Sequence, residues 1–297
     1  MPTADGAEFR QDPIESMTST ARRALAEIPG FENADVMLER AAGQSLNNEL
    51  WRVSAGSRVW ALRIGQPANT LGQDRDQEAV ATLAAARAGV SPAVANAGNG
   101  VLLLDWVEGR TLSDADFDDD GVRRMARLLR ASHVPAPRGL PTLSDRVEVM
   151  LSCAAARGAR VPDGLESILR RARAGETSAP VLTHHDVWPN NVIDDGDRLW
   201  LVDWEFAGAG DGMFDLATVA RAANLDTDGE HALLEEYGFP GGAHRLAEAR
   251  WSIGLFEGAW ALAMHTARGS DGGFDFARHA SDMFAGLENA PAEWLSQ

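Results

Sequence analysis

The chain has 297 residues, which is enough for one large domain or two modest ones with their own hydrophobic core. Asp and Glu total 44 against 27 Arg, and the net charge of −17 disfavours nucleic acid and anionic membranes, which attract basic surfaces. The single cysteine, Cys153, excludes an internal disulfide and indicates a reducing, cytoplasmic location. The absence of Lys excludes Schiff-base and catalytic-lysine mechanisms.

The first part of the chain is predicted to combine two helices with β-strands. Residues 1–30 form a polar tail and a first helix over Ser16–Ile28, without the pattern of a signal peptide. Two alternating apolar runs within Leu50–Ile64 surround a Ser-Ala-Gly-Ser turn and predict a hairpin. The Ala-rich segment Asp74–Val90 predicts a helix, and the apolar run Asn99–Val107 predicts another strand.

The rest of the chain is predicted to be mainly helical. Two short apolar runs flank the turn Asp194–Asp197 and predict a second hairpin inside this helical region. No apolar stretch approaches the roughly 20 residues that a membrane span needs. We therefore expect an α+β fold with a tail and first helix over 1–30, a β-rich N-terminal lobe over 31–107 and a larger, mainly helical C-terminal lobe over 108–297.

The segment Val181–Ala217 carries the residues with the clearest chemistry. It contains His184-x-Asp186-x4-Asn191, and twelve residues after Asn191 comes Asp203, beyond the predicted hairpin. Transfer of a phosphoryl group to a hydroxyl needs a carboxylate that accepts the hydroxyl proton, and oxygen ligands that hold Mg²⁺ on the phosphates. An Asp and an Asn in one loop, together with a second carboxylate after a hairpin, supply both, so the spacing predicts a kinase-type site.

At these residues the chain resembles the aminoglycoside phosphotransferase and choline kinase superfamily, which has a protein-kinase-like fold. The resemblance runs from about Glu39 to about Ala280. The sequence Val202-Asp203-Trp204-Glu205-Phe206 is similar to that of bacterial choline and ethanolamine kinase-like proteins. The resemblance implies two lobes with ATP in the cleft between them.

The resemblance also implies roles for the loop residues. By it, Asp186 is the catalytic base and Asn191 and Asp203 are ligands of Mg²⁺. Asp215 is the carboxylate that braces the catalytic loop, and His184 is interpreted as a buried imidazole that holds the loop rather than a proton carrier. The alternative for Asp186, a turn residue without function, is disfavoured by the register of Asn191 and Asp203.

Nucleotide contacts are implied mainly in the N-terminal lobe. Residues 43–48 resemble the nucleotide-covering loop, although only one Gly is present and Asn47 stands where the family commonly has Thr. Arg63 occupies the position of a phosphate-contacting cation for which kinase-like folds often use Lys, and Glu78 fits its helix partner. Residues 105–112 resemble the connector between lobes. The implied ATP-binding set is Asn47, Asn48, Arg63, Glu78, Asp105, Trp106 and Val107.

Candidate residues for the acceptor have two interpretations each. Phe256 and Trp260 are four residues apart on a predicted helix and share a face, so they either pack in the core or form an aromatic wall for a quaternary ammonium. Glu205 is either a further carboxylate of the metal site or a polar loop residue. The proposed substrate-binding set is Trp188, Glu205, Phe256, Glu257 and Trp260.

Together these features predict a cytoplasmic kinase that uses ATP and Mg²⁺ to phosphorylate a small cationic amino alcohol, with choline or ethanolamine as the leading acceptor. The alternatives within the same fold are an aminoglycoside, macrolide or thiamine kinase. An alternative of another class is a nucleotide-binding pseudokinase, which the intact Asp186, Asn191 and Asp203 disfavour. Neither a nucleic acid nor a membrane is an expected partner, and the oligomeric state stays open.

Overall fold

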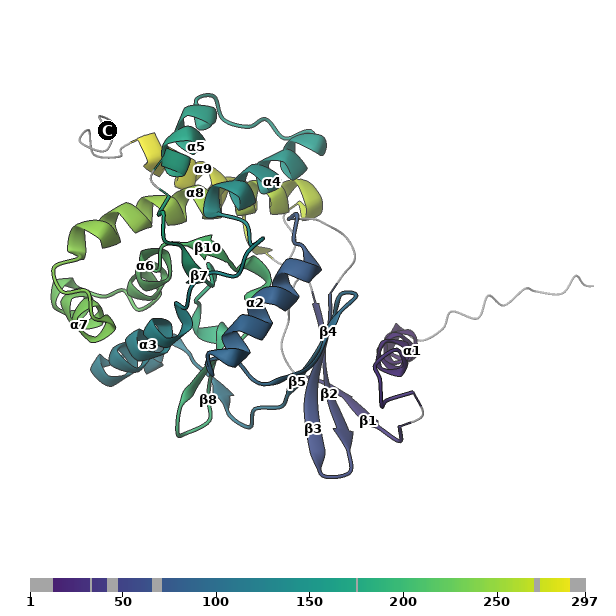
Figure 1. Ribbon diagram of the computed structural model, residues 1–297. Coiled ribbons are helices and arrows are strands. Elements are labelled where there is room, and N and C mark those ends of the chain that lie inside the picture. Colours follow the sequence, from purple (N-terminus) through teal and green to yellow (C-terminus); the bar gives the residue numbers. More distant parts are fainter. Residues whose placement is uncertain are drawn as a thin grey trace, which may run out of the picture. The chain divides into compact units, whose positions relative to one another are not determined.

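The computed structural model describes residues 13–32, 34–41, 48–65, 71–174, 176–269 and 273–288 (Figure 1). The chain divides into two compact units, one of residues 1–67 and 94–106 and the other of residues 68–93 and 107–297. The sequence-based division groups residues 68–93 with the N-terminal lobe. In the structure they cluster with the second unit, because their helix packs against the short helical turn at Trp204–Phe206.

The first unit contains a five-stranded antiparallel sheet in the order β1-β2-β3-β5-β4. The predicted hairpin is confirmed, since β2 and β3 pair with Trp51 opposite Leu62. Successive side chains along a strand point to opposite faces of the sheet. Trp51, Val53, Trp60 and Leu62 therefore all point into the core of this unit. The strands are β1 (Met37–Arg40), β2 (Asn48–Ala55), β3 (Arg58–Gly65), β4 (Val94–Gly98) and β5 (Val101–Asp105).

Two details of this unit differ from the sequence-based expectation. Helix α1 begins earlier than predicted and spans Pro13–Ala26, with Ala21 and Leu25 buried against the sheet core. The sequence did not predict strand β4. Its residues, Val-Ala-Asn-Ala-Gly, show no apolar alternation, and the strand exists because it pairs with β5.

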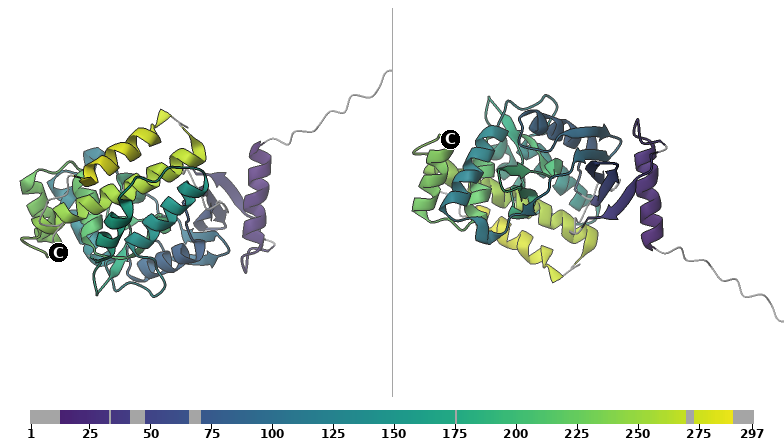
Figure 2. Two further views of the ribbon diagram at one scale, coloured as in Figure 1. Left: turned by 90° about the horizontal axis from the view of Figure 1, so that it is seen from above. Right: turned by 90° about the horizontal axis from the view of Figure 1, so that it is seen from below.

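The second unit has a mainly helical core. Helices α8 and α9 lie side by side, as both views of Figure 2 show, and α8 also packs on α4 and α6. No helix in the described part of this chain is both long and apolar enough to cross a membrane. The helices of this unit are α2 (Arg75–Arg87), α3 (Asp119–Ser132), α4 (Leu143–Ala156), α5 (Leu165–Ala174), α6 (Met213–Ala222), α7 (Thr227–Tyr237), α8 (Ala243–Arg268) and α9 (Phe276–Glu288).

Two small antiparallel sheets within the helical unit hold the loops that carry chemistry. Strands β7 (Val181–Thr183) and β10 (Gly208–Gly210) pair with each other, and β8 (Val192–Asp194) pairs with both β6 (Arg110–Thr111) and β9 (Leu199–Leu201). The predicted hairpin around residues 194–197 is therefore confirmed as β8 and β9. The described part of this unit also contains the short 3₁₀ turns η1 (Asp114–Asp116), η2 (Pro189–Asn191) and η3 (Trp204–Phe206).

Candidate active site

A buried carboxylate holds the loop between β7 and β8 in place. Asp215, near the start of α6, is fully buried and accepts hydrogen bonds from the backbone N–H groups of His184 at 2.7 Å and His185 at 2.9 Å. His133 lies 3.1 Å from the same carboxylate and 2.8 Å from the hydroxyl of Tyr237. Burial alone would raise the pKa of Asp215, but the hydrogen bond and charge of His133 keep that pKa below its usual value. Asp215 is therefore an ionised anchor for the loop.

His184 connects this loop to the segment that carries Asp203. Its Nε2 donates to the carbonyl oxygen of Val202 at 2.9 Å, and its Nδ1 accepts from the backbone N–H of Asp186 at 3.2 Å. Burial lowers the pKa of His184, which is consistent with a neutral ring protonated on Nε2. The ring also packs edge-on against Trp204, with centroids 4.6 Å apart. A neutral imidazole with both nitrogens engaged in this way fits the predicted holding role.

Asp186 and Asn191 are bonded to each other within the loop. The Asn191 side-chain amide donates to the carbonyl oxygen and to carboxylate Oδ2 of Asp186, both at 2.9 Å. Burial first, and then the carboxylates of Asp203, Glu205 and, more weakly, Glu257, together raise the pKa of Asp186 to about 8. These acidic groups converge on Asp186 from two other segments of the chain, the turn at residues 203–205 and helix α8.

Asp203 is presented by an unusual backbone conformation. It stands between β9 and η3 with φ 67° and ψ 63°, in the left-handed region that non-glycine residues rarely adopt. His185, at the other side of the site, also has a positive φ of 64°. Such strain persists only where the surroundings impose it, and it concentrates at functional sites.

The donor set at this position suits Mg²⁺. Among the described residues, no group of three or more His, Cys, Asp or Glu side chains forms a ready-made metal site. Mg²⁺ is commonly held by one or two protein oxygen ligands and completed by phosphates and water, which matches one carboxylate and one amide oxygen. The charges of Asp203 and Glu205 act on Asp186, and a cation among these carboxylates would offset that concentration of negative charge.

Glu205 and Glu78 share a cation that the sequence analysis missed. Nη1 of Arg75, in α2, lies 2.7 Å from Glu78 and 3.2 Å from Glu205, and both carboxylates are buried. Arg75 therefore links α2 to η3. Glu78 and its predicted partner Arg63 belong to different units, so their pairing stays a prediction.

The remaining predicted nucleotide residues lie mostly in the first unit. Arg63 is buried in β3, opposite Leu102 of β5, and Asn48 is buried at the start of β2. At the end of β5, Asp105 forms an exposed ion pair with Arg58 at 3.6 Å. The structure also places the guanidinium of Arg52 5.5 Å from the ring centre of Trp106, and assigns Val107 to the second unit. Asn47 lies outside the described residues.

The two aromatic residues expected to share a helix face pack on the same hydrophobic cluster but have different ring partners. Phe256 is 5% exposed and packs edge-on against Phe206 and Phe214 in the core. Trp260 is half-buried and packs against Phe274 and Phe276, with centroids 6.3 and 5.5 Å away. Of the pair, only Trp260 has part of its side chain exposed to bind an acceptor.

A series of side-chain contacts connects the loop that carries Asp186 to helices α8 and α9. Glu257 of α8 binds Arg221 of α6 at 2.7 Å and His279 of α9 at 3.2 Å. The guanidinium of Arg221 lies 6.0 Å from the ring centre of Trp188, which stands between Asp186 and η2. The structure thus connects Trp188 to Glu257 through Arg221, and Glu257 in turn to His279; the sequence spacing pointed to neither Arg221 nor His279.

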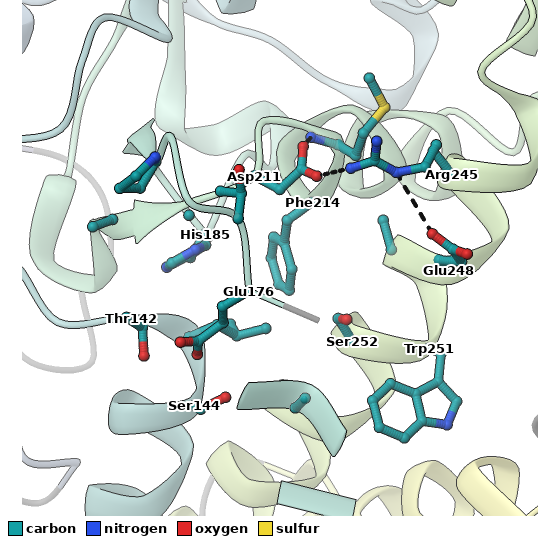
Figure 3. A pocket seen from close by; sticks show the side chains of 18 of the residues that line it. Thr142, Ser144, Glu176, His185, Asp211, Phe214, Arg245, Glu248, Trp251 and Ser252 are labelled. Carbon is teal, nitrogen blue, oxygen red and sulfur yellow. Dashed lines mark hydrogen bonds and ion pairs between the residues drawn. The ribbon is translucent and has the colours of Figure 1, made fainter. Parts of the chain in front are cut away.

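A separate pocket of about 510 Å³ lies behind the loop (Figure 3). The ring of His185 lines it, whereas Asp186, Asn191 and Asp203 do not. Arg245 spans its rim and binds Asp211 and Glu248. The pocket is therefore distinct from the group of residues around Asp186.

The antiparallel sheet unit, the helical unit and the loop around Asp186 define a phosphotransferase of the protein-kinase-like class. The chain belongs to the phosphotransferase enzyme family, whose family model matches residues 38–249. Both conclusions agree with the resemblance found in the sequence.

Individual relatives agree with this assignment. A LicA protein homolog of Metamycoplasma hominis is 27% identical over 143 residues, which cover 46% of this chain and 56% of the relative. The chain thus spans about half the length of that curated relative. A choline/ethanolamine kinase family protein of Mesorhizobium loti is 25% identical, with a TM-score of 0.68 and 95% of each chain covered. The choline kinase LicA of Streptococcus pneumoniae has a TM-score of 0.73 at 17% identity, with 92% of this chain and 99% of that chain covered.

Proposed function

We propose that this protein is an ATP- and Mg²⁺-dependent kinase that transfers the γ-phosphoryl group of ATP to the hydroxyl of a small amino alcohol, with choline or ethanolamine as the leading acceptor. The observation that carries the proposal is the loop of Asp186 and Asn191, which Asp215 holds through two backbone hydrogen bonds and His184 ties to the segment of Asp203. Family membership and the choline kinase-like relatives support the same reaction.

In this proposal Asp186 orients the acceptor hydroxyl and takes its proton as the phosphoryl group moves. Asn191 keeps the Asp186 carboxylate in place through the bond to Oδ2, so the free oxygen is the one available to the hydroxyl. Burial and the neighbouring carboxylates raise the pKa of Asp186, and the positive charge of Mg²⁺ would lower it again and favour the ionised form that accepts the proton. Asp203 and the amide oxygen of Asn191 would hold Mg²⁺, which would supply positive charge for the phosphates.

Nucleotide binding is assigned to Asn48, Arg63 and residues 105–107, and Asn47 is retained as a sequence-based member of this set. Arg63 would bind the phosphates, because the chain has no Lys to do so. Glu78 would orient it.

The acceptor side is assigned to Trp188, Glu257 and Trp260. A permanent cation cannot donate a hydrogen bond. Aromatic ring faces, through cation–π attraction, and nearby carboxylates are therefore suitable groups to bind it. The net charge of −17 is favourable for any cationic acceptor, so it supports choline, ethanolamine, thiamine and aminoglycosides equally.

The test is a coupled assay of ADP release with choline, ethanolamine, thiamine, a macrolide and several aminoglycosides. The proposal expects turnover with an amino alcohol that requires Mg²⁺ and disappears in Asp186→Asn. If only an antibiotic is phosphorylated, the assignment as a kinase stands, and the amino alcohol is wrong as the acceptor. ATP binding without turnover on any acceptor would favour the pseudokinase.

A further inference from the structure

A buried arginine lies behind the acidic groups of the candidate site. Arg146, in the second turn of α4, is 5% exposed, and its Nη2 donates to the carbonyl oxygen of Ala207 at 2.7 Å. Within the described part of the chain no carboxylate lies at ion-pair distance from this guanidinium, and its Nε has no hydrogen-bond partner. Arg146 is therefore a buried charge whose strongest contact is one backbone oxygen.

Stability does not explain such a residue. Burying a cation is costly, and an apolar side chain of similar volume often leaves a protein equally stable or more stable. Burial lowers the pKa of Arg146 to about 10, so the guanidinium is still charged at neutral pH. A charge that is retained at such a position indicates a task other than holding the fold together.

The surroundings of Arg146 indicate that task. The acidic groups that act on its charge are Asp74, at the N-terminus of α2, and Glu205, in η3. Glu205 is also bound by Arg75 at 3.2 Å. The buried Glu205 carboxylate thus lies in the field of two arginines, one from α2 and one from α4, and it is only two residues from Asp203.

The backbone after Asp203 lies tightly along the start of α4. The N–H of Ala209 donates to the carbonyl oxygen of Pro141 at 2.8 Å, two residues beyond the oxygen that Arg146 binds. A Cβ on Gly208 would lie 2.6 Å from the Pro141 oxygen and 2.8 Å from the His185 ring, so this position accommodates only glycine. Arg146 and Pro141 together fasten the segment that begins with the strained Asp203.

We propose that Arg146 is a positioning residue for the metal-binding side of the site, which holds the turn 203–207 through Ala207 and offsets the charge of Glu205, so that Asp203 is presented to the metal. This inference rests on the proposed function, because it takes Asp203 as a ligand of Mg²⁺. It reassigns Glu205 from substrate binding to the support of this turn.

The test compares Arg146→Met and Arg146→Lys with the wild type in the full chain. Affinity for Mn²⁺ is measured by electron paramagnetic resonance in the presence of the β,γ-imido analogue of ATP, and backbone exchange of residues 203–208 by hydrogen–deuterium exchange. Arg146→Met is expected to weaken Mn²⁺ binding about tenfold, the scale for partners of metal ligands, and to speed exchange of the turn. Affinity for the nucleotide without metal should be unchanged, and Arg146→Lys should recover part of the loss.

Arg250→Met is the matched control, because Arg250 of α8 binds Glu230 of α7 away from these residues. It should alter neither measurement. If Arg146→Met does not fold, the Mn²⁺ affinity of Arg146→Lys tests the inference, because this variant keeps the charge but loses the planar guanidinium group. Mn²⁺ affinity equal to wild type in the folded variants overturns the inference.

The two proposals fail in different ways. A wild type that binds Mn²⁺ with the nucleotide analogue but phosphorylates no acceptor refutes the proposed kinase and leaves the role of Arg146 standing. A wild type that phosphorylates choline, with variants of unchanged Mn²⁺ affinity, refutes the role of Arg146 alone.

Discussion

Asn191 donates both hydrogens of its amide to Asp186, one to the carbonyl oxygen and one to carboxylate Oδ2, each at 2.9 Å. The amide oxygen of Asn191 is thereby turned away from Asp186. This oxygen accepts from the side-chain amide of Asn190 at 3.2 Å, and it is the oxygen that we propose would hold Mg²⁺. Asp186 and Asn191 are thus joined by two hydrogen bonds.

Replacing Asp186 by Asn should lower turnover by about 10²–10⁴-fold, the usual scale for loss of a general base, with the fold and ATP affinity preserved. The measurement is single-acceptor kinetics beside thermal unfolding. Asp197→Asn, in the exposed turn between β8 and β9, is the control and should retain full turnover. Near wild-type turnover of Asp186→Asn would remove this residue from its role.

Asp203→Asn should remove most of the Mg²⁺-dependent part of ATP binding, by on the order of tenfold or more. Asn tolerates the left-handed backbone at this position, so the substitution changes the charge without adding strain. Calorimetric titrations of ATP with and without Mg²⁺ separate the two contributions. Equal affinity of variant and wild type for Mg·ATP would contradict the assignment.

His185 should contribute stability that rises between about pH 4 and pH 6.5, whereas Asp186, whose pKa is raised to about 8, contributes in the opposite direction. Burial lowers the pKa of this histidine from 6.5 to about 4, Nδ1 donates to the carbonyl oxygen of Phe206, and Nε2 lies 2.8 Å from the hydroxyl oxygen of Thr183. The unfolded chain therefore binds more protons in this range, and stability is fully present above pH 6.5 and lost as the pH falls toward 4. The shift corresponds to about 3 kcal/mol.

Urea unfolding across this pH range checks the expectation. His185→Gln, which cannot take up the proton, should lose this contribution, so its stability relative to wild type should fall as the pH rises from 4 to 6.5. His184 contributes in the same direction, so the difference between the two curves is the quantity to compare. Parallel curves would mean that His185 is already protonated in the fold.

Phe256 and Trp260 should respond differently to truncation. Phe256→Ala removes a buried ring packed against Phe206 and Phe214 and should cost about 3–5 kcal/mol of the free energy of unfolding. Trp260→Ala should raise the KM for choline about tenfold, or about 1.4 kcal/mol, and leave the KM for ATP unchanged. If Trp260→Ala raises the KM for choline and the KM for ATP equally, Trp260 has a structural role and does not bind the acceptor.

Local patterns in the sequence determined much of the architecture. The hairpin of β2 and β3, the helix α2 and the hairpin of β8 and β9 each follow from apolar periodicity and turn residues within some twenty positions. The positions of Asp186, Asn191 and Asp203 beside short strands were also predictable, whereas their roles in phosphoryl transfer stay a prediction. Strand β4 was not predictable, since its own residues carry no alternation and only pairing with β5 makes it a strand.

The tertiary structure alone decided how the proposed catalytic residues are supported. Arg75 reaches Glu205 across 130 positions, Arg146 reaches Ala207 across 61, and His133 reaches Tyr237 across 104. No periodicity within a helix or strand encodes such pairs, because each partner looks like an ordinary surface or core residue in its own segment. The same applies to Phe256 and Trp260, which share a spacing of four on one helix but face different neighbours, since α6 covers one and α9 the other. Sequence spacing sets which side chains share a local face, whereas the packing of distant elements sets what each face meets.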